Sequence, residues 1–168
     1  VLCNEGDVIL AEKPSFIGSL NAFKSYRVDL KGVTLETDGV NIAELEEKLK
    51  EGGVKLVYLI PNFQNPTGNT MSWEKRKAAF ELCKKYGAII LEDNPYGDLR
   101  FAGEDVKSIK TLDTEGSVIY SGTFSKILSP GIRVGYVCAH KDIVQKIVVC
   151  KQVADVHSTM WSKMLAYR

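Results

Sequence analysis

The sequence has no long hydrophobic run, and its charges balance almost completely. None of its apolar stretches approaches the roughly 18 residues needed to cross a membrane. Lysine and arginine total 22 residues and aspartate and glutamate total 21, so the formal net charge is +1. We therefore expect a soluble protein without a membrane contact. The charge gives no indication of a nucleic-acid surface or a polyanionic partner.

Cysteine and histidine are also scarce, and neither is arranged for a metal site. The four cysteines contain no C-x-x-C pair, and the nearest two, Cys138 and Cys150, are 12 positions apart. This spacing argues against a disulfide framework or a zinc site and favours a reducing compartment, so we expect a cytoplasmic protein. His140 and His157 have no partner pattern, and we predict no bound metal.

The chain is long enough for one domain, but neither end has the form of a natural terminus. Its 168 residues can bury roughly two-thirds of the surface of the unfolded chain. It starts at Val1 without a methionine or a signal peptide, and it stops at Arg168 inside a helical pattern. We therefore expect this chain to be a fragment of a longer protein.

Apolar strands alternate with amphipathic helices along the chain. We expect strands at residues 8–11, 26–30, 33–35, 54–60, 88–91, 118–120 and 134–139, with Gly32 marking a turn or bulge. One helix begins after Asn41, with Glu44 in the capping-box position, and a second runs from Ser72 to Gly87. A long helix follows the last strand. This alternation predicts an α/β fold with a mostly parallel sheet.

Three of these strands are followed by unusual polar segments. They are Pro61 to Gly68 with the sequence PNFQNPTG, Asp93 to Tyr96 with the sequence DNPY, and Thr123 to Lys126 with the sequence TFSK. Taken singly, they suit a turn, a helix cap and a surface lysine. In parallel sheets, however, ligands bind beyond the carboxyl ends of the strands. The three segments together are therefore the candidate site.

As a group, these segments resemble the class I and II aminotransferases, which are pyridoxal 5'-phosphate (PLP) enzymes of fold type I. The family has an Asn in an N-P-T-G turn, an Asp-x-x-Tyr after a strand, an [S/T]-x-S-K motif and a following Arg. These stand here as Asn65, Asp93, Tyr96, Lys126 and Arg133. The spacings of 28 from Asn65 to Asp93, 33 to Lys126 and 7 to Arg133 are similar to the branch with kynurenine and 2-aminoadipate aminotransferases.

The resemblance implies a three-layer αβα fold with a mostly parallel sheet. Residues 1–168 would form the central part of the PLP-binding large domain, without the family's N-terminal segment and C-terminal small domain. The family's members are homodimers with shared active sites, so a homodimer is implied for the full-length protein. We expect the fragment alone to be inactive.

The resemblance also assigns catalytic roles. Lys126 would form a Schiff base with the cofactor aldehyde, and once displaced it would act as general base and then acid. Asp93 would pair with the pyridine nitrogen and keep it protonated. Tyr96 and Asn65 would contact the phenolic oxygen of the ring. Lys126, Asp93 and Tyr96 are the expected catalytic residues.

The remaining cofactor contacts come from the same comparison. Thr123 and Ser125 would offer hydroxyls to the phosphate, and Arg133 would offer a bidentate cation. Phe16 falls where the family has an aromatic ring stacked on the pyridine face. Many relatives have tyrosine there, and phenylalanine keeps the stacking but lacks the hydroxyl.

The expected function is transfer of an amino group from an amino acid to a 2-oxo acid. Two alternatives share the motifs. A PLP-dependent C–S β-lyase would use the same residues, because the reaction depends on pocket residues outside the motifs. An aminotransferase-like sensor domain of a winged-helix transcription regulator would keep the lysine and the phosphate contacts.

Overall fold

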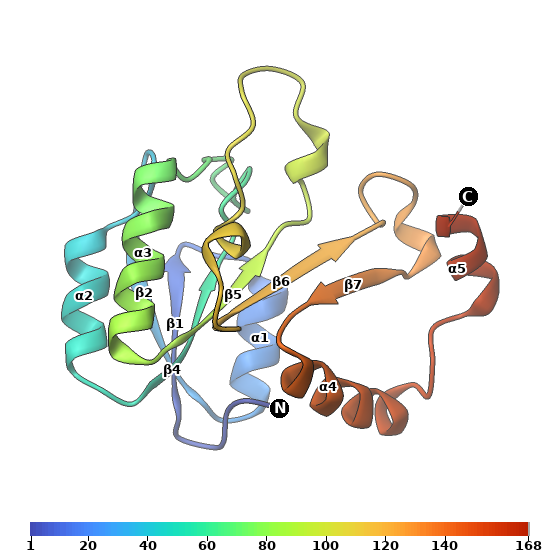
Figure 1. Cartoon of the computed structure of the whole chain (residues 1–168), viewed down its shortest axis with the longest axis horizontal. Helices are drawn as coiled ribbons and strands as arrows, with labels where there is room; N and C mark the ends of the chain where they lie inside the picture. The colour runs from blue at the N-terminus through green and yellow to red at the C-terminus, as the bar shows by residue number, and fades with distance from the viewer. Residues whose placement is uncertain (168) are drawn as a thin grey trace.

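The chain forms a single seven-stranded sheet with helices on both faces (Figure 1). This computed structural model describes residues 1–167. The strands are β1 (Val8–Lys13), β2 (Asp29–Glu36), β3 (Gly39–Val40), β4 (Val54–Leu59), β5 (Ile89–Asp93), β6 (Val118–Thr123) and β7 (Gly135–Cys138). Their order is β3-β2-β1-β4-β5-β6-β7, and only the edge strands β3 and β7 run antiparallel to their neighbours. The predicted α/β fold with a mostly parallel sheet is confirmed.

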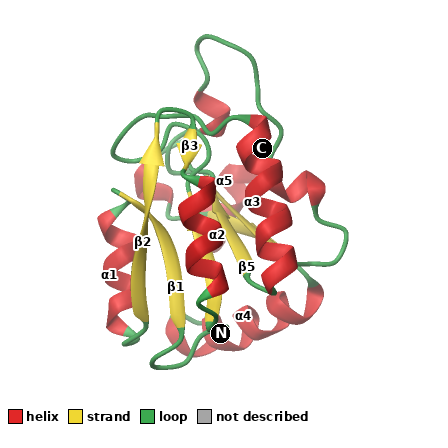
Figure 2. Cartoon of the chain, turned by 90° about the vertical axis from the view of Figure 1, so that its left-hand side faces the viewer, coloured by secondary structure: helices red, strands yellow, loops and turns green. Residues whose placement is uncertain are grey.

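Helices complete the three layers. They are α1 (Ile17–Ser25), α2 (Ile42–Lys50), α3 (Trp73–Tyr86), α4 (Lys141–Ala154) and α5 (Met160–Tyr167), with short 3-10 turns η1 (Gly97–Leu99), η2 (Ile109–Leu112) and η3 (Pro130–Ile132). Figure 2 shows α1 on one face of the sheet and α2 and α3 on the other. Within residues 1–167, no helix combines the length and apolar character needed to cross a membrane.

Two hydrophobic clusters lie on opposite faces of the sheet. The larger one packs Val57 and Leu59 of β4 toward the α2 and α3 layer. The smaller one contains Tyr58 and Ile60, which pack with Phe23 of α1. Successive side chains of a strand point to opposite faces, so β4 contributes to both clusters. This explains why its sequence is apolar almost throughout.

The helix ends mostly follow the sequence signals. The Asn41 side chain accepts a hydrogen bond from the Glu44 backbone N–H at 2.9 Å, as predicted. In a capping box the Glu44 carboxylate would accept from the Asn41 backbone N–H. This part of the prediction is wrong, because the carboxylate accepts from Thr34 N–H at 2.8 Å. Ser72 caps α3, and Gly87 ends it in the left-handed conformation at φ 71°.

Two expectations about the elements are wrong, and one helix carries no sequence signal. Gly32 lies inside the continuous strand β2, where an added Cβ would come 3.0 Å from the Lys13 side chain. Helix α1 was not predicted, because none of its residues is buried and its apolar periodicity is weak. The long C-terminal helix is two helices, separated near Val156, whose φ of 63° is incompatible with a continuous helix.

Candidate active site

One cleft at the carboxyl ends of the central strands brings together five of the predicted residues. Its volume is about 200 Å³. It is lined by Phe16, Ile60, Asn65, Asp93, Pro95, Tyr96 and Lys126. These residues lie in the segments that follow β1, β4, β5 and β6, or at the end of β5 itself. The cleft is therefore at the position where open α/β sheets bind ligands.

Asp93 is the last residue of β5, and a residue outside the cleft holds its carboxylate by a hydrogen bond. Its Oδ2 accepts a hydrogen bond from the Tyr58 hydroxyl at 2.6 Å, and the Tyr58 oxygen accepts one from Ser19 Oγ at 3.0 Å. Burial raises the pKa of Asp93, while the bond from Tyr58 acts in the opposite direction. Within the described residues, no hydrogen bond occupies Oδ1, so this oxygen is available to a ligand in the cleft.

Asn65, Tyr96 and Lys126 line the cleft next to one another. Asn65 Nδ2 lies 3.4 Å from the Tyr96 hydroxyl oxygen, to which it donates. Lys126 Nζ lies 5.6 Å from the centroid of the Tyr96 ring. An amide, a phenol and a primary amine are thus presented together, and the Asp93 carboxylate lies in the same cleft.

The N-P-T-G turn that contains Asn65 is fastened to the end of β1. Gln64 is buried, and its amide nitrogen donates to Glu12 Oε2 at 3.0 Å and to the Pro14 carbonyl at 2.9 Å. Its amide oxygen accepts from Thr67 N–H at 3.1 Å and from Thr67 Oγ1 at 2.8 Å. One side chain therefore fixes the turn on both sides of Asn65.

Glu12 is a buried carboxyl group directly behind the cleft. It is 3% exposed, and its Oε2 also accepts from Ile60 N–H at 3.2 Å. Burial raises the pKa of Glu12 to about 8, and the charge of Asp93 adds to this effect. At neutral pH, Glu12 is therefore mostly protonated and carries no charge next to Asp93.

Phe16 precedes α1 and lines the cleft, and the residue is 39% exposed. Gly18 makes room for this ring, because a Cβ at Gly18 would come within 2.7 Å of Phe16 ring atoms. The aromatic face is therefore held against the first turn of α1 and remains accessible. This placement is compatible with stacking on a planar ligand.

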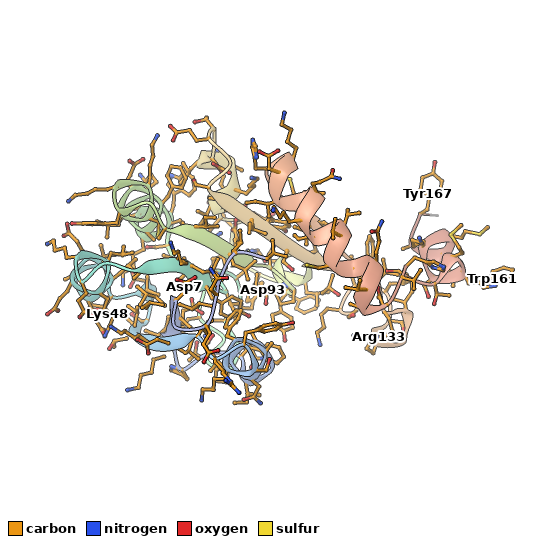
Figure 3. The ribbon with its side chains drawn as sticks, turned by 90° about the horizontal axis from the view of Figure 1, so that it is seen from below. Asp7, Lys48, Asp93, Arg133, Trp161 and Tyr167 are labelled. Atoms are coloured by element: carbon orange, nitrogen blue, oxygen red, sulfur yellow. The ribbon has the colours of Figure 1, made fainter. Side chains whose placement is uncertain are left out.

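The residues predicted to hold a phosphate do not line this cleft. Thr123 Oγ1 accepts from Ser125 N–H at 3.1 Å and donates to the Val134 carbonyl at 3.4 Å. Arg133 is exposed, donates to the Pro130 carbonyl at 3.0 Å, and lies well apart from Asp93 in Figure 3. Their role toward a phosphate stays a prediction.

The sequence predicts no role for four residues that support the cleft: Glu12, Ser19, Tyr58 and Gln64. Tyr58 counts as an apolar member of a buried strand, yet its buried hydroxyl needs a hydrogen-bond partner. That requirement is the signal that could have found it. Ser19 offers no such signal, because α1 itself was not predicted.

Comparison with known proteins gives a consistent result. A family model described as Aminotransferase class I and II matches residues 1–167. Aromatic-amino-acid aminotransferase 1 of Thermococcus litoralis is 47% identical over 173 residues, which cover 100% of this chain and 42% of that protein. An uncharacterized HTH-type transcriptional regulator of Bacillus subtilis is 37% identical, over 98% of this chain and 34% of the regulator.

Solved structures agree with these matches. The crystal structure of Pyrococcus horikoshii kynurenine aminotransferase in complex with PMP, KYN as substrates and KYA as products has a TM-score of 0.97. It is 42% identical, over 99% of this chain and 43% of that chain. The chain therefore spans about two fifths of the length of these aminotransferases.

Proposed function

The chain belongs to the class I and II aminotransferase family, and on this premise we propose that the full-length protein is a PLP-dependent transaminase. It would move an amino group from an amino acid to a 2-oxo acid. The observation that supports this most is the convergence of Asp93, Tyr96 and Lys126 on one cleft. When bound, PLP supplies an aldehyde for the substrate's amino group and a ring that accepts electrons from the bond broken at Cα.

The donor set of the cleft fits this cofactor. The free Oδ1 of Asp93 can accept a hydrogen bond from a protonated ring nitrogen, while Oδ2 stays bonded to Tyr58. Asn65 and Tyr96 offer an amide N–H and a hydroxyl O–H, which suit a phenolate oxygen. Phe16 offers an accessible aromatic face. A carboxylate, two donors and an aromatic ring thus match a planar, basic heterocycle.

Lys126 provides the only primary amine among the residues that line the cleft. We propose that it binds the aldehyde covalently and that, once released, it takes the proton from the substrate's Cα. Asp93 and Tyr96 would hold the ring in the orientation that this transfer requires. Lys126 therefore has two roles, attachment and proton transfer.

The phosphate contacts are part of the same proposal. Thr123 ends β6, and Ser125 and Arg133 follow it on either side of Lys126; their hydroxyl and guanidinium groups suit a phosphate. Thr123 Oγ1 already accepts a hydrogen bond from Ser125 N–H. Thr123 would therefore contact the phosphate while it also holds the backbone of Ser125 in place. These groups would then fix the phosphate next to the reactive amine.

The amino donor is proposed from the relatives. An aromatic amino acid, kynurenine or 2-aminoadipate is supported by the names of similar proteins from Thermococcus litoralis, Pyrococcus horikoshii and Thermus thermophilus. 2-Oxoglutarate is the proposed acceptor. We also propose a cytoplasmic location.

We propose that the full-length protein is a homodimer and that residues 1–168 are the central part of its large domain. The share of the relatives that the chain covers supports the domain assignment. Exposed apolar side chains on α4 and α5 support an interface there. They include Val149, Val153, Met160, Trp161, Met164 and Leu165.

The function is tested on the full-length protein with PLP. Aromatic amino acids, kynurenine and 2-aminoadipate are added singly, and the cofactor's absorption should shift to that of its pyridoxamine form. Added 2-oxoglutarate should then restore the original spectrum. Release of pyruvate or a thiol from cystathionine-like substrates would instead favour the β-lyase. Specific DNA binding without turnover would favour the regulator.

The attachment residue has its own test. After borohydride reduction, mass spectrometry should find the cofactor on the peptide that contains Lys126. The Lys126→Ala variant should lose this modification and all turnover. Cofactor that remained covalently attached to the reduced variant would refute the assignment of Lys126.

A further inference from the structure

We propose that Tyr58, braced by Ser19, is a positioning residue that fixes the Asp93 carboxylate as the partner of the cofactor's ring nitrogen. The proposal rests on the proposed function and adds a positioning residue to the proposed cofactor site. Tyr58 lines none of the cleft, and it would act on the cofactor only through Asp93. Through that contact it would set the charge of the ring.

The hydrogen-bond directions support this role. Ser19 Oγ donates to the Tyr58 oxygen at 3.0 Å, so the single Tyr58 proton is free for Asp93. The Tyr58 to Asp93 distance of 2.6 Å is in the range of a hydroxyl donating to an ionised carboxylate. The three residues therefore form one directed chain from α1 through β4 to the end of β5.

Packing holds the Tyr58 hydroxyl in place. The side chain is 1% exposed and lies in the smaller hydrophobic cluster with Ala11 and Ile60. The Phe23 ring meets it edge-on, with centroids 5.4 Å apart. A ring fixed in this way cannot turn its hydroxyl away, so the donor is positioned before any ligand binds.

The consequence concerns a shared proton. With a cofactor bound, one proton lies between the Asp93 carboxylate and the ring nitrogen. A donor to Asp93 stabilises the ionised carboxylate, so the proton stays on the ring and the ring keeps its positive charge. Without Tyr58, the proton moves toward Asp93 and the ring becomes a weaker electron acceptor.

Three other titratable groups lie near Asp93 and Tyr58. Glu12 at the end of β1 interacts with both Asp93 and Tyr58. Tyr96 and Lys126 line the same cleft as Asp93. None of these three groups donates a hydrogen bond to Asp93 in the structure. Tyr58 is therefore the donor that stabilises the ionised form of Asp93 over the protonated form.

The test uses the full-length protein with PLP and compares Tyr58→Phe with Tyr86→Phe. Both variants lose a hydroxyl that contacts a carboxylate, but Tyr86 contacts Glu46 in the helical layer, at 3.2 Å. A neutral ring makes the cofactor's link to Lys126 more basic. In Tyr58→Phe, the pH at which the visible absorption changes should therefore rise by about one unit.

Kinetics provide the second readout. In Tyr58→Phe, kcat should fall about tenfold while KM changes less than about twofold, because Tyr58 touches no substrate. Ser19→Ala should shift the absorption transition in the same direction by a smaller amount. Tyr86→Phe should match the wild type in both readouts.

An unchanged absorption transition in a folded Tyr58→Phe variant would overturn the proposal. If that variant fails to fold, Ser19→Ala decides, and an unchanged transition there overturns the proposal as well. The proposed function fails separately, when the wild type shows no covalent cofactor and no amino transfer, and the inference falls with it. An active wild type with an unaltered Tyr58→Phe spectrum refutes the inference alone.

Discussion

The carboxyl group of Glu12 and the side-chain amide of Gln64 are hydrogen-bonded at 3.0 Å, with both residues buried. The contact joins the end of β1 to the N-P-T-G turn after β4. It connects the segment that leads to Phe16 with the turn that holds Asn65. Two walls of the cleft are thus fixed relative to one another by a pair of residues that do not line it.

The pKa of Glu12 makes the stability of the protein depend on pH. Because burial raises this pKa to about 8 from an ordinary 4.5, the folded state holds the proton more tightly than the unfolded state. The stability from this group is complete below about pH 4.5 and is lost as the pH rises toward 8. Glu12→Gln should remove this loss, because its amide oxygen can still accept from Ile60 and Gln64.

Thermal melting of the full-length protein at pH 5 and pH 8 measures this effect. The difference between the two melting points should be smaller in Glu12→Gln than in the wild type, by an amount that corresponds to a few kcal/mol, of order 1.4 per pKa unit. Glu47→Gln, at an exposed position of α2, is the matched control. Equal pH dependence in Glu12→Gln and wild type would contradict the prediction.

Gln64 should control cofactor affinity without touching the cofactor. Gln64→Ala removes the bonds to Glu12, to the Pro14 carbonyl and to Thr67, so the turn is no longer fixed. We expect the dissociation constant for PLP to rise about tenfold, which corresponds to about 1.4 kcal/mol. Fluorescence titration of the full-length apoprotein measures it.

Thr67→Val is the graded control for that experiment. It removes one hydroxyl contact with Gln64 and keeps the bonds that reach β1. Its affinity should lie between those of the wild type and Gln64→Ala. Affinity as weak as that of Gln64→Ala would show that the contact with β1 is not what positions Asn65.

Arg76 should be needed for the fold next to the cleft. It is 0% exposed, and its guanidinium donates to Asn62 Oδ1 and to the backbone carbonyls of Met71, Pro61, Val106 and Lys107. Arg76→Met leaves two buried acceptors, Asn62 Oδ1 and the Met71 carbonyl, without the donors that the guanidinium supplies, whereas the Pro61 carbonyl still accepts from Met71 N–H. Each unsatisfied buried group costs about 1–3 kcal/mol, so we expect a loss of at least about 2 kcal/mol.

Arg76→Lys should recover little of this loss, because an ammonium lacks the planar fork that reaches several carbonyls. Melting of the full-length protein compares both variants with Lys77→Met at an exposed position of the same helix. A melting point for Arg76→Lys equal to that of the wild type would show that charge, and not the geometry of the fork, is what the site requires.

The sequence predicts the residues of the cleft better than the residues behind it. Asn65, Asp93 and Lys126 follow strands and stand in recognisable motifs, so their meeting at one edge of the sheet follows from the parallel topology. Tyr58 and Glu12 are determined by which face of a strand is buried and by what lies opposite. Such tertiary contacts leave no periodic signal in the chain.

Helix α1 shows the same limit at the level of secondary structure. Its residues are exposed or only partly buried, so its sequence has no continuous apolar stripe, and it was not predicted. Yet Ser19 reaches Tyr58, and Gly18 leaves the space that the Phe16 ring occupies. The cleft therefore depends on an element that sequence periodicity could not identify.

Gly18→Ala should change stability and cofactor binding in opposite directions. Gly18 lies in helix α1 without a positive φ, so alanine should stabilise the helix by up to about 1 kcal/mol. The same methyl group would lie 2.7 Å from the Phe16 ring and displace it. We expect PLP to bind several-fold more weakly, because the displaced ring no longer stacks.

A double-mutant cycle separates this effect from a general disturbance of the cleft. In a Phe16→Ala background there is no ring to displace, so adding Gly18→Ala should leave the PLP dissociation constant unchanged. Titration of the wild type, both single variants and the double variant measures the coupling. Additive losses would show that Gly18 acts on the cofactor by another route, such as a shift of α1 that reaches Tyr58 through Ser19.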